Sequence, residues 1–286
     1  MKGDRYSLDA LLPAEMAVKA EDIGVAKAGM STVTTLALAV LAGAFIALGA
    51  VFSTTVASGA AGVLPGGLIR LLTGLVFSLG LILVVVGGAE LFTGNTLIIM
   101  AWASRRLSHA ALLRNWALVY AGNFVGALGT VALVYLSGQY AFDGGAVGAA
   151  ALATARHKSE LGFVQAVVLG ILANGLVCLA VWLSLSARTT TDRILAVIFP
   201  ITAFVAAGLE HSIANMYFVP IGILIRAFAP VSFWSAIGAA PADYASVNST
   251  SFLLHNLLPV TIGNMIGGAV LVGATYWFVY LRRRSP

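Results

Sequence analysis

Charged residues are scarce in this chain. They make up 9% of its 286 residues, whereas hydrophobic residues make up 60% and the mean hydropathy is +0.97. A chain of this size cannot hide so much apolar surface from water by folding on itself, which excludes an ordinary water-soluble protein. The composition therefore predicts an integral membrane protein.

Cysteine is almost absent as well. The single Cys178 excludes an intramolecular disulfide and supports no metal site. An intramembrane enzyme would need a nucleophile and a base within reach, and inside the apolar stretches only Cys178 and His211 could form that pair. Cys178 lies in an apolar run without an activating cation. The sequence thus argues against an enzyme and indicates no cofactor.

A cleavable signal peptide is also missing from the first thirty residues. They contain no apolar stretch of roughly 7 to 15 residues followed by a small-residue cleavage site. We expect residues 1–30 to remain as a cytoplasmic tail, with a short amphipathic helix around Pro13 to Ala28. This tail is the part best suited to bind a cytoplasmic partner.

Six apolar stretches are long enough to cross a bilayer, which takes roughly 20 residues per helix. Their content of Gly, Ala, Leu and Val favours helices over a β-barrel. The second and fifth stretches are too long for one straight span and carry Gly-rich polar interruptions, which predicts two broken helices. The six stretches are residues 32–57, 66–104, 112–137, 160–187, 194–228 and 255–281.

The distribution of positive charge predicts the orientation in the membrane. The net charge is +5, from 16 basic and 11 acidic residues. With six spans, one side carries twelve of the basic residues and the other carries four, namely Arg70, Arg156, Lys158 and Arg226. This bias places both termini in the cytoplasm and argues against nucleic acid as a partner. We expect one transmembrane domain over residues 31–282 and a cytoplasmic C-terminal tail over 283–286.

Two spaced motifs recur in the two halves of the chain. Small residues recur in membrane helices because they pack closely, but this does not explain a Glu and an Asn at the same spacing. Three helices per half is an odd number, so the second half must enter from the opposite side. We therefore predict an inverted 3+3 repeat with halves of about 31–137 and 158–282. The motifs are Gly88-x-Glu90-x4-Asn95, repeated as Gly208-x-Glu210-x4-Asn215, and Asn115-x6-Gly122-Asn123-x2-Gly126, repeated as Asn256-x6-Gly263-Asn264-x2-Gly267.

The two predicted helix breaks favour the presence of an anion beside them. Freed N–H groups and the positive end of a helix dipole attract negative charge. Glu90 and Glu210 would be awkward beside an anion path, so we expect each to satisfy the bare N–H groups of its broken segment, turned away from the pore. A proton-relay role is the alternative. Asn95 and Asn215 complete these structural motifs.

His211 is the one histidine within a predicted break. Its ordinary pKa near 6.5 allows it to become a cation or to supply a proton when a cell acidifies. Asn174 and Thr93 could hydrogen-bond a small solute or His211. Equally, both could make interhelical hydrogen bonds with no ligand involved.

Four sequence blocks resemble the signature blocks of the formate/nitrite transporter family. The resemblance extends from Leu11-Leu12-Pro13 to Tyr280, and the tail and the run Arg156-His157-Lys158 are similar to the formate channels of that family. The blocks are Gly88–Thr93, Asn174–Ala180, Glu210–Met216 and Pro259–Asn264.

The resemblance implies an aquaporin-like fold of six spans, assembled as a homopentamer with a pore through each protomer. It also implies a central pore histidine, two hydrophobic slits and a basic residue at the outer mouth that draws anions in. The implied pore residues are His211, Asn174 and Thr93, the outer slit is Phe77, Leu81 and Phe204, the inner slit is Leu91 and Val177, and the outer basic residue is Lys158.

Together with this resemblance, the residues predict a pH-dependent channel for formate and similar small monovalent anions, and the resemblance implies a bacterial inner membrane. Apolar slits make a bare anion costly to pass, since a charge that leaves water loses its hydration. A nitrite or hydrosulfide channel and a proton-coupled formate carrier are the alternatives. The repeated helix breaks argue against a purely structural or partner-binding membrane protein.

Overall fold

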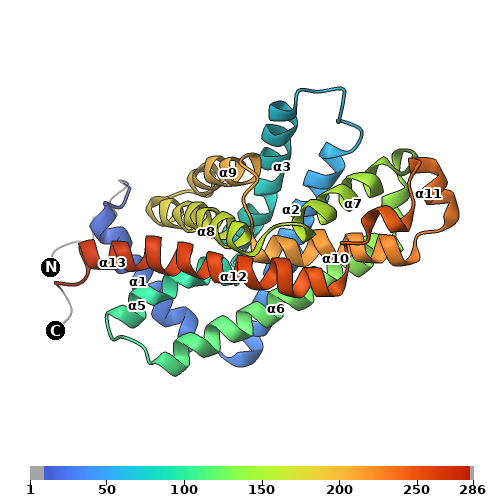
Figure 1. The fold of residues 1–286 in the computed structure, drawn as a ribbon. Helices are drawn as coiled ribbons and strands as arrows, with labels where there is room; N and C mark the ends of the chain where they lie inside the picture. The colour runs from blue at the N-terminus through green and yellow to red at the C-terminus, as the bar shows by residue number, and fades with distance from the viewer. Residues whose placement is uncertain (1–9, 284–286) are drawn as a thin grey trace.

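The computed structural model describes residues 10–283. Residues 1–9 of the expected N-terminal tail and residues 284–286 of the expected C-terminal tail lie outside this range. All regular structure in the described part is helical (Figure 1). The chain is an all-helical membrane protein, as its composition predicts. Within residues 10–283, five helices could cross a membrane by length and composition, and a sixth span arises if the bent pair α10 and α11 is counted as one.

The first half of the chain contains the tail helix, two long spans and one broken span. The break separates α3 from the short helices α4, η1 and α5. The elements are α1 Pro13–Gly29, α2 Thr32–Ala57, α3 Gly66–Gly87, α4 Phe92–Asn95, η1 Thr96–Ile98, α5 Ile99–Ala103 and α6 His109–Leu136.

The second half follows the same plan, with its break between α9 and α10. Its last span contains two π-helical segments, η5 and η6, on either side of α12, which the sequence pattern does not predict. The elements are η2 Gln139–Ala141, η3 Asp143–Gly145, α7 Ala146–Ser159, α8 Phe163–Ser186, α9 Thr190–Ala206, α10 Ser212–Phe228, α11 Val231–Ile237, η4 Pro241–Tyr244, η5 Ser251–Leu257, α12 Leu258–Met265, η6 Ile266–Ala274 and α13 Thr275–Tyr280.

Both breaks start at a glycine in the left-handed conformation. Gly88 has φ +78° and ends α3, and Gly208 has φ +70° just after α9. Such a glycine is the usual way to stop a helix, because no Cβ opposes a positive φ. The chain then runs extended through Leu91 and His211 before α4 and α10 begin.

The tail helix α1 is docked against the bundle rather than separate from it. Its Met16, Ala17 and Ala20 are buried against a cluster that includes Trp182 of α8 and Leu281 near the C-terminus. Figure 1 shows α1, α5 and α13 at one end of the molecule and α7 and α11 at the other. The predicted helix around Pro13 to Ala28 is confirmed, and it covers one end of the bundle.

Glycines let the two long helices of each half approach to backbone contact. A Cβ on Gly43 or Gly126 would collide with backbone atoms across the α2–α6 contact, at Asn123 and Val40 respectively. In the second half, a Cβ on Gly267 would likewise collide with the backbone of Ile171 in α8. Close backbone packing of this kind is a main source of helix association in membranes.

We expect Gly126→Val to destabilise the protein by about 3 kcal/mol, since the new side chain would have to push α2 away from α6. Gly129→Val is the matched control, because a Cβ on Gly129 in the same helix meets nothing within 4 Å. Thermal unfolding followed by size-exclusion chromatography in detergent measures the difference. Equal melting temperatures for the two variants would contradict the close packing described here.

Candidate functional site

The two helix breaks meet at a single polar contact. Thr93 Oγ1 from the first break lies 2.9 Å from His211 Nε2 of the second break. Thr93 has no exposed surface and His211 is 2% exposed. The two interrupted spans therefore meet in the molecule, at residues 118 positions apart in the chain.

The other ring nitrogen of His211 is already occupied. The backbone N–H of Ala214 donates to His211 Nδ1 over 3.1 Å, so the histidine caps the start of α10. A nitrogen that accepts a hydrogen bond carries no proton, so the neutral ring holds its proton on Nε2. The His211 Nε2–H group then donates to Thr93, whose own hydroxyl proton remains available to a second acceptor.

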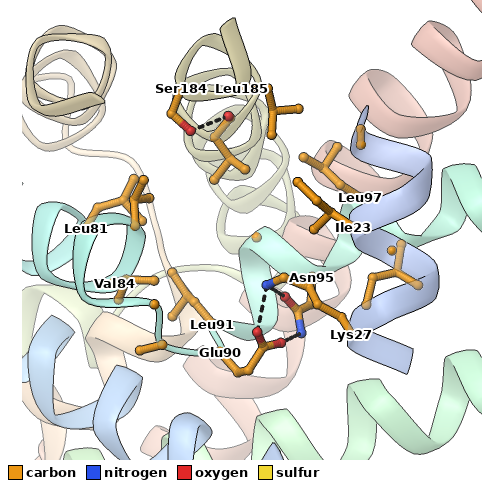
Figure 2. A pocket seen from close by; sticks show the side chains of 18 of the residues that line it. Ile23, Lys27, Leu81, Val84, Glu90, Leu91, Asn95, Leu97, Ser184 and Leu185 are labelled. Atoms are coloured by element: carbon orange, nitrogen blue, oxygen red, sulfur yellow. Dashed lines mark hydrogen bonds and ion pairs between the residues drawn. The ribbon is translucent and has the colours of Figure 1, made fainter. Parts of the chain in front are cut away.

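Glu90 lies in a polar network between the first break and the tail helix. Its carboxylate is 2.9 Å from Lys27 Nζ and accepts a 2.7 Å hydrogen bond from Asn95 Nδ2. Asn95 also donates to Asn115 Oδ1, and Asn115 donates to the backbone carbonyl of Lys27. Figure 2 shows Glu90, Asn95 and Lys27 joined in this way. The tail helix thus supplies the cation for the first break.

Glu210 has the equivalent network in the second half. Lys158 Nζ of α7 lies 2.7 Å from its carboxylate, and Asn215 Nδ2 donates to it over 2.7 Å. Asn215 also donates to Asn256 Oδ1, and Asn256 donates to the backbone carbonyl of Lys158. Lys27 on α1 and Lys158 on α7 make matching contacts. The correspondence between the two halves therefore includes α1 and α7 as well as the spans.

The bare N–H groups of the breaks have other partners than we expected. We predicted that the two carboxylates would accept them, but asparagines from the third and sixth spans do so. Asn123 Oδ1 accepts the N–H of Phe92 over 2.9 Å, and Asn264 Oδ1 accepts the N–H of Ser212 over 2.8 Å. Neutral acceptors suffice here, so the carboxylates remain available to pair with the lysines.

Two cavities approach this centre from opposite sides. The cavity on the side away from the tail helix, which we call the outer cavity after the predicted orientation, has a volume of about 300 Å³. It is lined by Phe77, Phe204, His211 and Lys158 among other residues. The ring centroids of Phe77 and Phe204 are 5.7 Å apart, and Phe204 lies 5.8 Å from the His211 ring. Phe77, Phe204 and His211 thus lie together in the wall of the outer cavity. Lys158 is not an open charge at the mouth, because its side chain is 11% exposed and paired with Glu210.

The inner cavity, of about 250 Å³, lies between α3, α8 and the tail helix (Figure 2). Leu81 and Leu91 line it, so Leu81 faces this cavity, whereas the resemblance groups it with the outer slit. Val177 is 1% exposed and lies in the same apolar cluster, but it does not line either cavity. Leu81 and Leu91 are buried at the inner side, as Phe77 and Phe204 are at the outer side.

The inner cavity also carries positive charge near the tail. Lys19 and Arg193 line it, and Lys19 Nζ donates to the carbonyl of Leu185 over 2.8 Å. Burial, together with the nearby Arg193 and Arg188, lowers the pKa of the Lys19 ammonium below its ordinary value. The basic side chains of this cavity thus lie at the end of the molecule that the tail helix covers.

Asn174 makes the interhelical contacts that were the alternative to a ligand role. Its amide nitrogen lies within hydrogen-bonding distance of Thr93 O, Thr96 Oγ1 and Asn264 O, at 3.3, 3.2 and 2.7 Å. It is fully buried and lines neither cavity. Asn174 therefore holds the backbone carbonyl of Thr93 in place.

Cys178 and Gly268 complete the cluster behind Thr93. Cys178 Sγ donates to Thr93 O over 3.3 Å, which gives this thiol a structural place away from His211. A Cβ on Gly268 would collide with Thr96 Oγ1 and Asn174 Nδ2, so a glycine is required where η6 passes the cluster. Sequence reasoning missed Lys27, Thr96 and Gly268, although the two repeated motifs contained the six asparagines that organise the breaks.

Comparison with known proteins identifies the family. A family model described as formate/nitrite transporter matches residues 14–278. The chain belongs to the formate/nitrite transporter family. It is 50% identical to the formate channel FocA of Escherichia coli (strain K12) over 285 residues, which is 100% of this chain and 99% of the relative. It is 43% identical to FocA of Haemophilus influenzae, with 95% of each chain covered.

A solved structure has the same fold. It is described as a pentameric formate channel with formate bound, and it is 44% identical to this chain with a TM-score of 0.82. The match covers 88% of this chain and 98% of that one. This member of the formate/nitrite transporter family is thus a multi-pass membrane transporter and no enzyme, as its sequence predicts.

We expect Lys158→Met to destabilise this transporter by about 3–5 kcal/mol, because it leaves the Glu210 carboxylate buried without a cation. The double variant Lys158→Met/Glu210→Gln should recover most of that stability, since a neutral Gln can still accept from Asn215. Melting temperatures in detergent measure both.

Lys27→Met is the control in the other half and should cost less, because the Lys27 side chain is 28% exposed. A double variant no more stable than Lys158→Met alone would contradict the pairing of Lys158 with Glu210.

Proposed function

We propose that this chain is a channel for formate and other small monovalent anions. It acts in a bacterial inner membrane with both termini in the cytoplasm, as a homopentamer with one pore in each protomer. The observation that carries the proposal is the contact of Thr93 with His211, which lies between an outer and an inner cavity. The similarity to FocA and to the pentameric structure supports the choice of formate and of the assembly.

The polar pair offers two hydrogen-bond donors between two pairs of apolar side chains, Phe77 with Phe204 and Leu81 with Leu91. The Nε2–H of His211 and the hydroxyl of Thr93 can each donate to one oxygen of a carboxylate that replaces their mutual contact. On either side the anion must pass Phe77 and Phe204, or Leu81 and Leu91, where a bare charge is costly. The donors offset part of that cost at the centre.

Proton coupling is the mechanistic alternative, and the geometry of His211 bears on it. A cationic ring would need a proton on Nδ1, where the N–H of Ala214 now donates. Charging the ring therefore breaks the cap of α10. A carrier would have to pass its proton through Nε2 and regain it in each cycle, whereas a channel needs only the neutral donor.

The direct test is formate entry into proteoliposomes that hold the purified protein. We expect faster entry than into empty vesicles, and a loss of roughly tenfold in Thr93→Val, which keeps the shape but removes one donor that is worth about 1.5 kcal/mol to a charged acceptor. Thr130→Val is a control on a hydroxyl outside the two cavities, because Thr130 donates only to Gly126 O. Entry no faster than into empty vesicles would refute the proposal. Direct competition with nitrite in the same vesicles decides between the two anions.

The variants His211→Asn and His211→Phe test the role of the ring. Asn can still accept the Ala214 N–H, so we expect normal stability, whereas Phe should lose about 1 kcal/mol with the cap. Neither side chain titrates, so the pH dependence of formate flux should change in both. Flux profiles across pH that match the wild type in both variants would remove His211 from the mechanism.

A further inference from the structure

The charges that line the outer cavity do not balance. Among its described lining residues, Arg70 and Lys158 are basic, Glu210 is the one acid, and His157 and His211 are uncharged in the formal count. Lys158 and Glu210 form an ion pair at 2.7 Å. At that distance their fields largely cancel for an anion still in the cavity. The remaining full positive charge belongs to Arg70.

Arg70 is placed and exposed in a way that suits an attracting charge. It lies on α3 seven residues before Phe77, two turns or about 10 Å outward on the same face of the helix. Its side chain is exposed, and within residues 10–283 its guanidinium has no hydrogen bond or ion pair. A cation with no acid beside it keeps its field for passing anions.

We propose that Arg70 is the residue that concentrates small monovalent anions in the outer cavity, ahead of the Phe77–Phe204 constriction. The inference rests on the proposed function and moves the attracting role from Lys158, whose charge Glu210 compensates, to Arg70. A cleft lined by one sign of charge raises the local concentration of the opposite ion. Arg70 acts on the entry of the anion and has no contact with it at Thr93 and His211.

The inner cavity has the same arrangement, which supports the assignment. There Lys27 is paired with Glu90, while Lys19 and Arg193 line the cavity without an acid partner among its lining residues. In each half, then, the lysine closest to the break is compensated by the glutamate of that break. The surplus positive charge is on other lining residues, Arg70 in the outer cavity and Lys19 and Arg193 in the inner one.

The test is formate exchange at equal concentrations inside and outside proteoliposomes, so that the orientation of each molecule in the vesicle has no effect. Arg70→Gln should lower exchange about two- to fivefold at low formate and about 0.01 M ionic strength, with little change at saturating formate. The difference should vanish near 1 M salt, where the Debye length is about 3 Å. Arg70→Lys should restore exchange, because it restores the charge. All measurements are made at about pH 7.5, where an ordinary histidine is mostly neutral.

Arg156→Gln is the matched control. Arg156 is an exposed arginine two residues before Lys158, but it lies over the Tyr244 ring at 5.5 Å and does not line the cavity. Low-salt exchange that is equally affected in Arg70→Gln and Arg156→Gln would overturn the assignment. So would a defect of Arg70→Gln that persists at high salt or is not restored by Lys, since either result indicates a structural role. Wild-type exchange no faster than in empty vesicles would instead refute the proposed function, and the inference with it.

Discussion

Two asparagines make the interrupted helices of this protein possible. Inside a bilayer an unpaired backbone N–H costs several kcal/mol, and a break exposes such groups. Asn123 and Asn264 each accept one of these N–H groups and donate to two backbone carbonyls, one in the break and one in the neighbouring long helix. The glycine contacts between α2 and α6 and between α8 and the last span hold the asparagines in reach. The polar contact of Thr93 with His211 depends on this support.

The glutamates of the breaks solve a different problem. A buried carboxylate is tolerated only with a cation and further hydrogen bonds, and each glutamate has both. The pairs leave the breaks with no net charge of their own. In the channel that we propose, an anion meets neutral donors at Thr93 and His211 and uncompensated positive charge only in the two cavities. This arrangement avoids a tight binding site at the centre, since a fixed cation there would hold a monovalent anion too tightly to release it quickly.

Much of this fold follows from the sequence, because apolar length and glycine position determine where membrane helices begin and stop. The spans, both breaks and the tail helix are where the pattern predicts them. The repeat of Glu90 and Asn95 at Glu210 and Asn215 also predicts paired polar sites. The pattern does not show which group each of these side chains contacts. The spacing shows that a carboxylate and an amide lie near a break, but only tertiary packing brings Lys27 from the tail to Glu90.

The same limit explains the residues that were misplaced. Leu81 and Phe77 share one face of α3, so no periodicity tells which cavity each of them lines. Asn174 is polar within an apolar helix, which fits a ligand contact and an interhelical bond equally well. Its neighbours Thr96 and Gly268 come from two other elements, and the π-helical turns that bring Gly268 close have no signature in a run of small apolar residues.

The docking of α1 has a practical consequence for the study of its tail. Because Lys27 belongs to the polar network of the first break, the boundary between tail and channel lies before this residue, at a point that the hydropathy pattern does not mark. A shortened protein that starts at Ser31 would differ from the parent in the electrostatics of its inner cavity as well as in the coverage of its mouth. Altered transport in such a protein would therefore reflect the changed charge of the inner cavity as well as the loss of the helix that covers it. A truncation that ends before α1 keeps Lys27 and its contacts in place, so its transport reports on the removed residues alone.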